Sequence, residues 1–126
     1  MALHESAEMY LETIYQLSQE RQAVRSIDVA EALNYSRPSV SRAVGLLKQD
    51  GYLEVDGDGF LHLTQLGETT AQKIYERHTI LSAALIALGV DKETADEDAC
   101  KIEHVISEKT LAAIKKHMKQ FGNGAV

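Results

Sequence analysis

The chain has 126 residues, of which 44% are hydrophobic, with a single cysteine and a net charge of −6. This composition excludes an internal disulfide, leaves no apolar run near the roughly 18 residues of a membrane span, and weighs against extensive phosphate binding. The N-terminus also lacks the basic and then apolar pattern of an export signal, so we expect a cytoplasmic protein in which Cys100 is a free thiol.

The first part of the chain predicts two helices and a tight turn. Apolar residues spaced three and four apart indicate a helix over residues 5–20. A second helix is predicted to begin at Ser26, whose side chain can cap it, and to bury an aliphatic stripe that ends at Leu33. Residues 34–36 then predict a turn, in which Asn34 tolerates a positive φ.

A third helix and a hairpin follow. Pro38 is acceptable in the first turn of this helix because no intrahelical N–H is needed there, and Asp50-Gly51 is expected to end it. Two alternating segments, residues 52–55 and 60–63, flank Asp56-Gly57-Asp58-Gly59 and predict a β-hairpin.

The second half predicts helices only. Thr64 can cap a long helix that runs to Gly89, residues 91–106 suit another helix, and Ser107 can start a last one that runs to about Lys119. Apolar residues surround the end of the long helix on almost every side, and only a dimer interface or a deep core would bury so many of them. These residues are Leu81, Ala83, Ala84, Leu85, Ile86 and Leu88.

Residues 29–43 fit a helix-turn-helix. Ala30 allows two helices to approach closely, Asn34 suits the turn, and the aliphatic residues of the third helix face back onto the second. Between residues 36 and 48 every charged residue is basic, so this segment can bind DNA although the net charge of the whole chain is negative. The outer face carries hydroxyls and forked donors suited to phosphates and base edges, and its candidate DNA contacts are Ser36, Arg37, Pro38, Ser39, Ser41 and Arg42.

A purely structural interpretation of this segment is a three-helix core with a polar surface. The hairpin that follows the third helix favours DNA binding instead, because a wing placed there usually touches DNA. Its tip is acidic, so we expect the wing itself to contribute little.

Cys100, Glu103 and His104 form the most informative cluster. On a helix they lie about one turn apart, so that a thiolate, a carboxylate and an imidazole converge. That mixture suits a divalent transition metal better than Ca²⁺ or Mg²⁺, which prefer oxygen ligands. The plainer interpretation of a lone helical cysteine is a small core residue.

Three further residues are candidates for the same chemistry. Met9 and Glu12 share one face of the first helix, and His78 lies in the long helix. Met9 could equally pack in the core, Glu12 could be solvated, and His78 could simply be exposed. The metal interpretation gains weight because the cluster occurs together with a helix-turn-helix.

The chain resembles the diphtheria toxin repressor family of metal-dependent regulators, which includes the manganese transport regulators. The resemblance spans about residues 5–119 and implies a homodimer through the helices after residue 64, with a metal site that bridges the first helix and the dimerisation module. It rests on Glu8–Tyr15, Ser36–Ser41, Arg77-His78 and Glu97–Val105.

The resemblance also implies a set of metal ligands, partly from its iron-responsive branch and partly from its manganese-responsive branch. Sulfur at Met9 and Cys100 favours Fe²⁺, Co²⁺, Ni²⁺ or Zn²⁺ over Mn²⁺. Asp96 is less certain, since iron-type members carry a His there. The implied ligands are Met9, Glu12, His78, Cys100, Glu103 and His104, with Asp96 as the less certain addition.

The expected fold class is mainly α with a small β-hairpin. A winged helix-turn-helix DNA-binding domain over residues 1–63 would precede a helical dimerisation and metal-binding domain over residues 64–126. The resemblance implies a short, two-domain member without the SH3-like domain of longer ones.

We therefore expect a metal-dependent transcriptional repressor, and not an enzyme, that controls metal homeostasis genes. Its partners would be double-stranded operator DNA and a second copy of the chain, with no membrane and no small organic substrate. The cofactor would be Fe²⁺, or alternatively Mn²⁺, with Co²⁺, Ni²⁺ or Zn²⁺ as substitutes.

Three alternatives stay open. The first is a redox-sensing winged-helix regulator in which Cys100 is oxidised. The second is a small metallohydrolase, although the sequence offers no further acid–base pair for it. The third is a protein-interaction module in which the helix-turn-helix is only structural.

Overall fold

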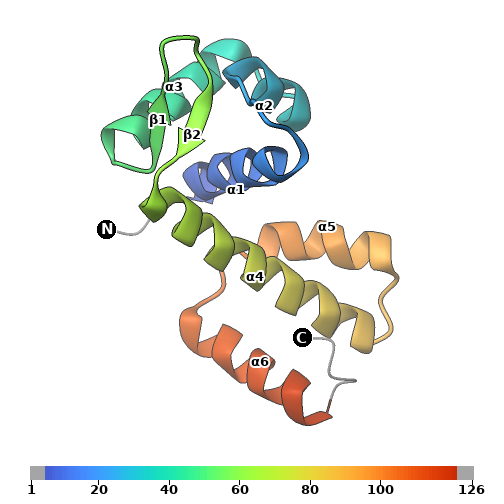
Figure 1. Ribbon diagram of the computed structural model, residues 1–126. Coiled ribbons are helices and arrows are strands. Elements are labelled where there is room, and N and C mark those ends of the chain that lie inside the picture. Colours follow the sequence, from blue (N-terminus) through green and yellow to red (C-terminus); the bar gives the residue numbers. More distant parts are fainter. Residues whose placement is uncertain (1–4, 122–126) are drawn as a thin grey trace. The chain divides into compact units, whose positions relative to one another are not determined.

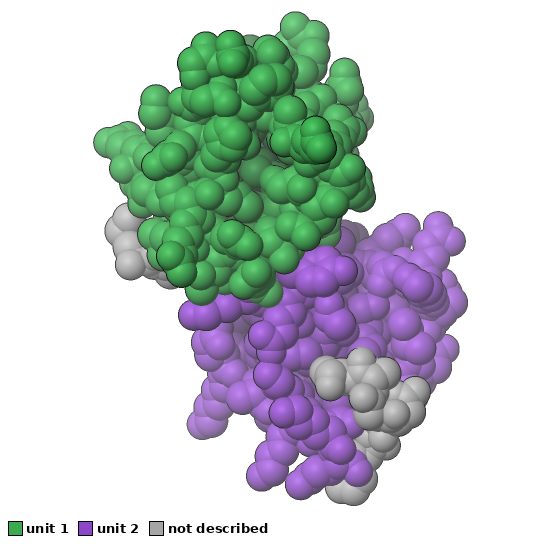
Figure 2. Space-filling model, viewed as in Figure 1, with its two compact units in different colours: residues 1–72 green, residues 73–126 purple. Residues whose placement is uncertain are grey.

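The computed structural model describes residues 5–121, which form two compact units, residues 1–72 and 73–126, that divide within one long helix (Figures 1 and 2). The elements of this range confirm the expected order of helices and hairpin, whereas the expected domain boundary after residue 63 stays a prediction. None of the described helices is long and apolar enough to cross a membrane. The elements are α1 Glu5–Glu20, α2 Ser26–Leu33, α3 Arg37–Gln49, β1 Leu53–Val55, β2 Leu61–Leu63, α4 Gln65–Ala87, α5 Lys92–Ile102 and α6 Glu108–Phe121.

The first unit is built around an aliphatic core that α1, α2, α3 and the hairpin share. Ile14, Val29 and Val40 are fully buried, one from each helix, and Leu53 and Leu61 close the core from the hairpin. This arrangement follows from the helical spacing of apolar residues in each segment. It leaves the opposite face of α3 to solvent.

The turn between α2 and α3 is fixed by two local features. Asn34 ends α2 in the left-handed conformation, with φ of 57°, as the sequence predicts. Ser36 caps α3 by accepting a hydrogen bond from the Ser39 N–H at 3.3 Å, and Pro38 follows in the first turn. The direction of α3 is therefore set locally, by Asn34, Ser36 and Pro38.

The expected cap of α2 is wrong. Ser26 is the first residue inside the helix, and Arg25 occupies the capping position. Asp28 reaches back and accepts the Arg25 N–H at 2.8 Å, a bond that also places a carboxylate at the positive end of the helix. An acid three residues after the cap thus takes the role expected for the Ser26 hydroxyl.

The hairpin is antiparallel, and Glu54 pairs with His62 at its centre. Each strand is one residue shorter than predicted. The Asp56 carboxylate organises the turn, because one oxygen accepts the N–H groups of Asp58 and Phe60 and the other lies 2.8 Å from His62 Nε2. These interactions, with the His62 bond the largest, lower the pKa of Asp56.

The first turn of α4 packs tightly against the residue that precedes β1. Thr64 caps α4 as predicted, accepting the Gly67 N–H at 3.1 Å, and its own N–H donates to the Tyr52 carbonyl. A Cβ added at Gly67 would lie only 2.1 Å from that carbonyl oxygen. Gly67 is therefore required by close backbone approach.

We expect Gly67→Ala to destabilise the protein by about 1–3 kcal/mol, the usual range for overpacking a tight site. Gly45, in the exposed middle of α3, provides the matched control because a Cβ there meets nothing within 4 Å. Gly45→Ala should raise stability by roughly 0.5–1 kcal/mol, the helix preference of Ala over Gly. Urea unfolding of both variants measures the difference, and equal stability of the two would contradict this interpretation of Gly67.

Two helices, α4 and α5, end before their predicted last residues. The chain leaves α4 after Ala87 because Gly89 adopts a positive φ of 105°. It leaves α5 after Ile102, four residues before the predicted end. The Glu103 carbonyl accepts the Arg77 guanidinium at 2.8 Å, which takes this carbonyl out of the helical ladder.

The last helix begins where Ser107 predicts it. The Ser107 hydroxyl accepts the Thr110 N–H at 3.1 Å, and α6 runs two residues beyond the predicted end at Lys119. An apolar groove of about 570 Å³ is lined by the end of α4, the segment around the end of α5, and α6. Leu88, which is 81% exposed, lies on its rim and is the most exposed large hydrophobic residue of the described chain.

Candidate metal centre and DNA-binding helix

Three potential metal ligands meet within the second unit. His78 lies on α4, Cys100 near the end of α5, and Glu103 immediately after it. One ligand atom from each lies within 4.8 Å of the other two. His78 Nδ1 is 2.9 Å from a Glu103 carboxylate oxygen and 3.7 Å from the Cys100 sulfur.

The cluster is buried at one side and open at the other. The Glu103 side chain is fully buried, the His78 side chain is 19% exposed, and the Cys100 thiol is exposed. The hydrogen bond to Glu103 raises the pKa of His78 above its usual value. An ion that binds Nδ1 therefore has to displace a proton that Glu103 stabilises.

The donor set fits a transition metal. Glu103 Oε1 is buried and accepts no hydrogen bond within the described part of the chain, although His104 Nε2 lies 3.3 Å away. A buried carboxylate oxygen without such a partner is costly unless a positive charge reaches it. Sulfur, imidazole and carboxylate together match the ligands of Zn²⁺ and Fe²⁺ sites, and not the oxygen shells of Ca²⁺ or Mg²⁺.

Asp96, the less certain ligand, faces the other edge of the His78 ring. Its Oδ1 lies 3.9 Å from His78 Nε2 and accepts the Ser82 hydroxyl at 2.5 Å. Its Oδ2 accepts the Lys92 ammonium at 2.8 Å. The Lys92 and Ser82 bonds, in that order, lower the pKa of Asp96.

Met9 and Glu12 belong to α1, in the first unit. Glu12 is buried, and Met9 is partly buried. The Met9 sulfur accepts a hydrogen bond from the Tyr35 hydroxyl at 3.3 Å, and the Tyr35 ring packs edge-on against Tyr10. Sequence reasoning missed Tyr35, since a half-exposed tyrosine in a turn has no pattern that links it to a methionine 26 residues away.

The candidate DNA contacts lie on the solvent face of α3. Arg37 and Arg42 are exposed, whereas Val40 and Val44 on the opposite face are buried. The Ser36 hydroxyl accepts the Ser39 N–H and also donates to the Ser39 hydroxyl at 2.8 Å, so it is partly committed to holding the start of the helix. Arg37, Arg42 and Lys48 are the charged residues of α3, and all three are basic and exposed.

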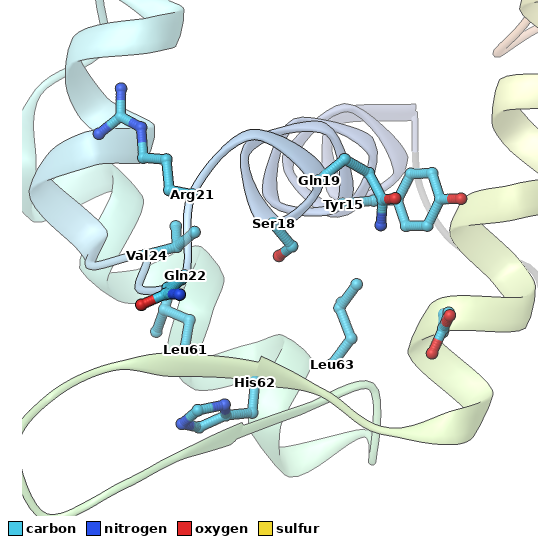
Figure 3. A pocket seen from close by; sticks show the side chains of 10 residues that line it. Tyr15, Ser18, Gln19, Arg21, Gln22, Val24, Leu61, His62 and Leu63 are labelled. Atoms are coloured by element: carbon cyan, nitrogen blue, oxygen red, sulfur yellow. The ribbon is translucent and has the colours of Figure 1, made fainter.

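A second, more polar hollow of about 230 Å³ lies in the first unit, between the end of α1 and β2 (Figure 3). Ser18 of α1 and Leu63 of β2 face each other across it. Arg21, at its edge, is paired with Asp28 at 3.1 Å. None of the candidate metal ligands or DNA contacts lines this hollow.

Two family models match almost the whole chain. Residues 2–61 match the iron-dependent repressor N-terminal DNA-binding domain. Residues 64–123 match the iron-dependent repressor metal-binding and dimerisation domain. The first match contains the candidate DNA-binding helix, and the second contains the cluster around His78.

Curated proteins and solved structures agree with these matches. The chain is 37% identical to the iron-dependent repressor IdeR of Mycobacterium tuberculosis, over 96% of this chain and 55% of IdeR. It is 33% identical to the diphtheria toxin repressor of Corynebacterium diphtheriae, over 96% of this chain and 56% of that protein. The manganese regulator SloR superposes with a TM-score of 0.79 at 26% identity, over 94% of this chain and 55% of SloR. The chain thus spans about half the length of these relatives.

Proposed function

Because the chain belongs to the iron-dependent repressor family, we propose that it is a transcriptional repressor that binds operator DNA as a homodimer when a divalent transition metal is bound. Control of metal homeostasis genes, in the cytoplasm, is the role that this assignment implies. The members named above are repressors or regulators, and we propose that this chain likewise performs no enzymatic reaction.

The approach of His78, Cys100 and Glu103 within one unit is the observation that carries the proposal. These residues would hold the ion through nitrogen, sulfur and oxygen. The ion would bring positive charge to Glu103 Oε1, which is buried and accepts no hydrogen bond from the described residues. Met9, Glu12 and His104 are proposed as further ligands on the strength of the sequence pattern.

We propose Fe²⁺ as the physiological ion and Mn²⁺ as the alternative. A thiolate ligand disfavours Mn²⁺, which prefers carboxylate and carbonyl oxygens, and cellular availability selects among the remaining ions. Relatives named for iron and for manganese both resemble the chain. Whichever ion acts, metal and DNA must raise each other's affinity by the same factor if the two sites are coupled.

The operator can be found by selection from a random pool of DNA duplexes, with anaerobic Fe²⁺ and again with a chelator. A two-fold symmetric dimer should enrich an inverted repeat whose half-sites are spaced by about one helical turn, 10–10.5 base pairs. The enrichment should disappear with the chelator. Equal enrichment of the same sequence under both conditions would contradict metal-dependent repression.

Arg42 tests the proposed DNA face. Removing one phosphate contact should weaken binding to all sequences similarly and reduce the salt slope, d log K/d log[salt], by about 1 unit in magnitude. We expect this result for Arg42→Ala. Lys116→Ala, which removes an exposed cation from α6, should leave the slope unchanged. Anisotropy at four salt concentrations measures both variants, and identical slopes would remove Arg42 from the interface.

A redox-sensing regulator is the second candidate, because the Cys100 thiol is exposed beside His78. A sulfur that binds a metal is shielded from reagents by the ion, whereas a sulfur that senses oxidants has to react with them. If Cys100 is a ligand, bound Co²⁺ should protect it from alkylation by iodoacetamide, and Cys100→Ser should weaken metal-dependent DNA binding. If the thiol senses oxidants, peroxide should change the DNA affinity of the metal-free protein reversibly by reduction.

A further inference from the structure

The two nitrogens of His78 face different carboxylates. Nδ1 lies 2.9 Å from Glu103 and 3.7 Å from the Cys100 sulfur, so this edge of the ring belongs to the proposed metal cluster. Nε2 lies on the other edge, 3.9 Å from Asp96 Oδ1. An imidazole that binds metal through one nitrogen carries its proton on the other, and a partner for that proton fixes both the tautomer and the ring plane.

Asp96 is itself held in place from two sides. The Ser82 hydroxyl, from α4 one turn after His78, donates to Oδ1 at 2.5 Å. Lys92, one turn before Asp96 on α5, donates to Oδ2 at 2.8 Å. The Lys92 side chain is 81% exposed, and exposed ion pairs contribute little stability. The buried Ser82 is therefore the main anchor of the Asp96 carboxylate.

We propose that Asp96 is a positioning residue for His78 and not a metal ligand. It accepts a hydrogen bond from Nε2–H, so that the Nδ1 lone pair is left to the ion, and it is anchored for this purpose by Ser82. This inference rests on the proposed metal site. A movement of about 1 Å by either side chain brings Nε2 within hydrogen-bonding distance of Oδ1.

Two observations oppose the alternative that a second ion binds between His78 Nε2 and Asp96. Both oxygens of Asp96 already accept strong donors, and one of these donors is a cation. In addition, among residues 5–121 no group of three close His, Cys, Asp or Glu ligands includes Asp96. The proposal therefore predicts that the cluster takes one ion in each subunit.

The experiment titrates the metal-free full chain with Co²⁺ under anaerobic conditions. A thiolate-to-cobalt charge-transfer band reports binding at Cys100, and the end point gives the number of ions. We expect Asp96→Ala to weaken Co²⁺ binding roughly 10–100-fold, the usual effect of losing the partner of a ligating imidazole. Asp96→Glu should restore part of the affinity, and Ser82→Ala should show a smaller loss. Asp98→Asn, which alters an exposed carboxylate of the same helix, is the matched control.

The tautomer of His78 can be measured directly, and a general loss of protein stability would not change it. In ¹⁵N-labelled protein loaded with Zn²⁺, the wild-type ring should carry its proton on Nε2, and Asp96→Ala should broaden or shift that signal. Unchanged affinity and an unchanged ring signal in Asp96→Ala would overturn the proposal. So would two Co²⁺ ions per wild-type subunit that become one in Asp96→Ala. If wild-type protein gives no charge-transfer band at all, the proposed metal site itself fails.

Discussion

Glu103→Gln is expected to abolish the response of DNA binding to metal while leaving the metal-free protein folded. The substitution keeps the size of a fully buried side chain and removes its charge. Loss of an outer partner of a ligand already costs roughly 10–100-fold in metal affinity, so loss of a charged ligand should cost more than about 100-fold. At metal concentrations that saturate the wild type, the variant should bind operator DNA as weakly as the metal-free protein.

The physical reason lies in the charge that Glu103 carries. Its Oε2 lies 2.9 Å from His78, and its Oε1 is buried and accepts no hydrogen bond from the described residues. A neutral amide lowers the attraction for a cation at both oxygens. The same change removes the carboxylate partner of His78, but above the ordinary pKa of histidine the imidazole can lose its proton, so no unpaired charge is left and the melting temperature of the metal-free protein should fall little.

Glu97→Gln is the control, because it removes an exposed carboxylate from α5 without touching the cluster. Co²⁺ titration and DNA anisotropy, performed on both variants and the wild type, measure the effect. Wild-type metal affinity in Glu103→Gln would exclude Glu103 as a ligand. A strongly lowered melting temperature without metal would indicate a structural role instead.

Leu88→Glu is expected to convert the proposed dimer into a monomer and, through this, to weaken operator binding by about 100-fold or more, because the two DNA-binding domains would no longer act as one bivalent unit. Leu88 lies on the apolar groove of the second unit and is 81% exposed. A residue so exposed contributes little to the fold of its own subunit. Burial of an unpaired carboxylate in an interface is costly.

Leu66→Glu is the matched control, since Leu66 is also exposed on α4 but does not line the groove. Its carboxylate would lie in the first turn of the helix, where negative charge is tolerated. Light scattering across micromolar concentrations gives the mass of each variant. A wild-type monomer, or a dimer in Leu88→Glu, would rule out this groove as the dimer interface.

Local sequence signals predicted the DNA-binding half of the fold well. Asn34 in the turn, Ser36 and Pro38 at the start of α3, and Thr64 at the start of α4 each act through neighbours within a few residues. The hairpin follows from alternation around a Gly-rich turn. The cap of α2 was missed because Ser26 and Asp28 offer competing local bonds, and their order in the chain does not decide between them.

The candidate site was less accessible from the sequence. The triplet Cys100, Glu103 and His104 was found by helical spacing, but the end of α5 at Ile102 was not predicted, and neither was the hydrogen bond that the Glu103 carbonyl accepts from Arg77, far away in the sequence. The approach of His78 to Cys100 joins two helices and came only from resemblance. The position of Asp96 behind His78 depends on Ser82, whose role no local pattern indicates.

The most direct test of metal-controlled DNA binding is an anaerobic titration with Fe²⁺ and, separately, Mn²⁺, read by fluorescence anisotropy of the selected operator duplex. We expect Fe²⁺ to increase operator affinity by roughly 5–150-fold, the usual range of coupling between sites, and to do so at lower concentration than Mn²⁺. If Mn²⁺ acts at the lower concentration, the assignment of iron is wrong. If neither ion changes the affinity, the cluster of His78, Cys100 and Glu103 does not control DNA binding, and the chain is not a metal-dependent repressor.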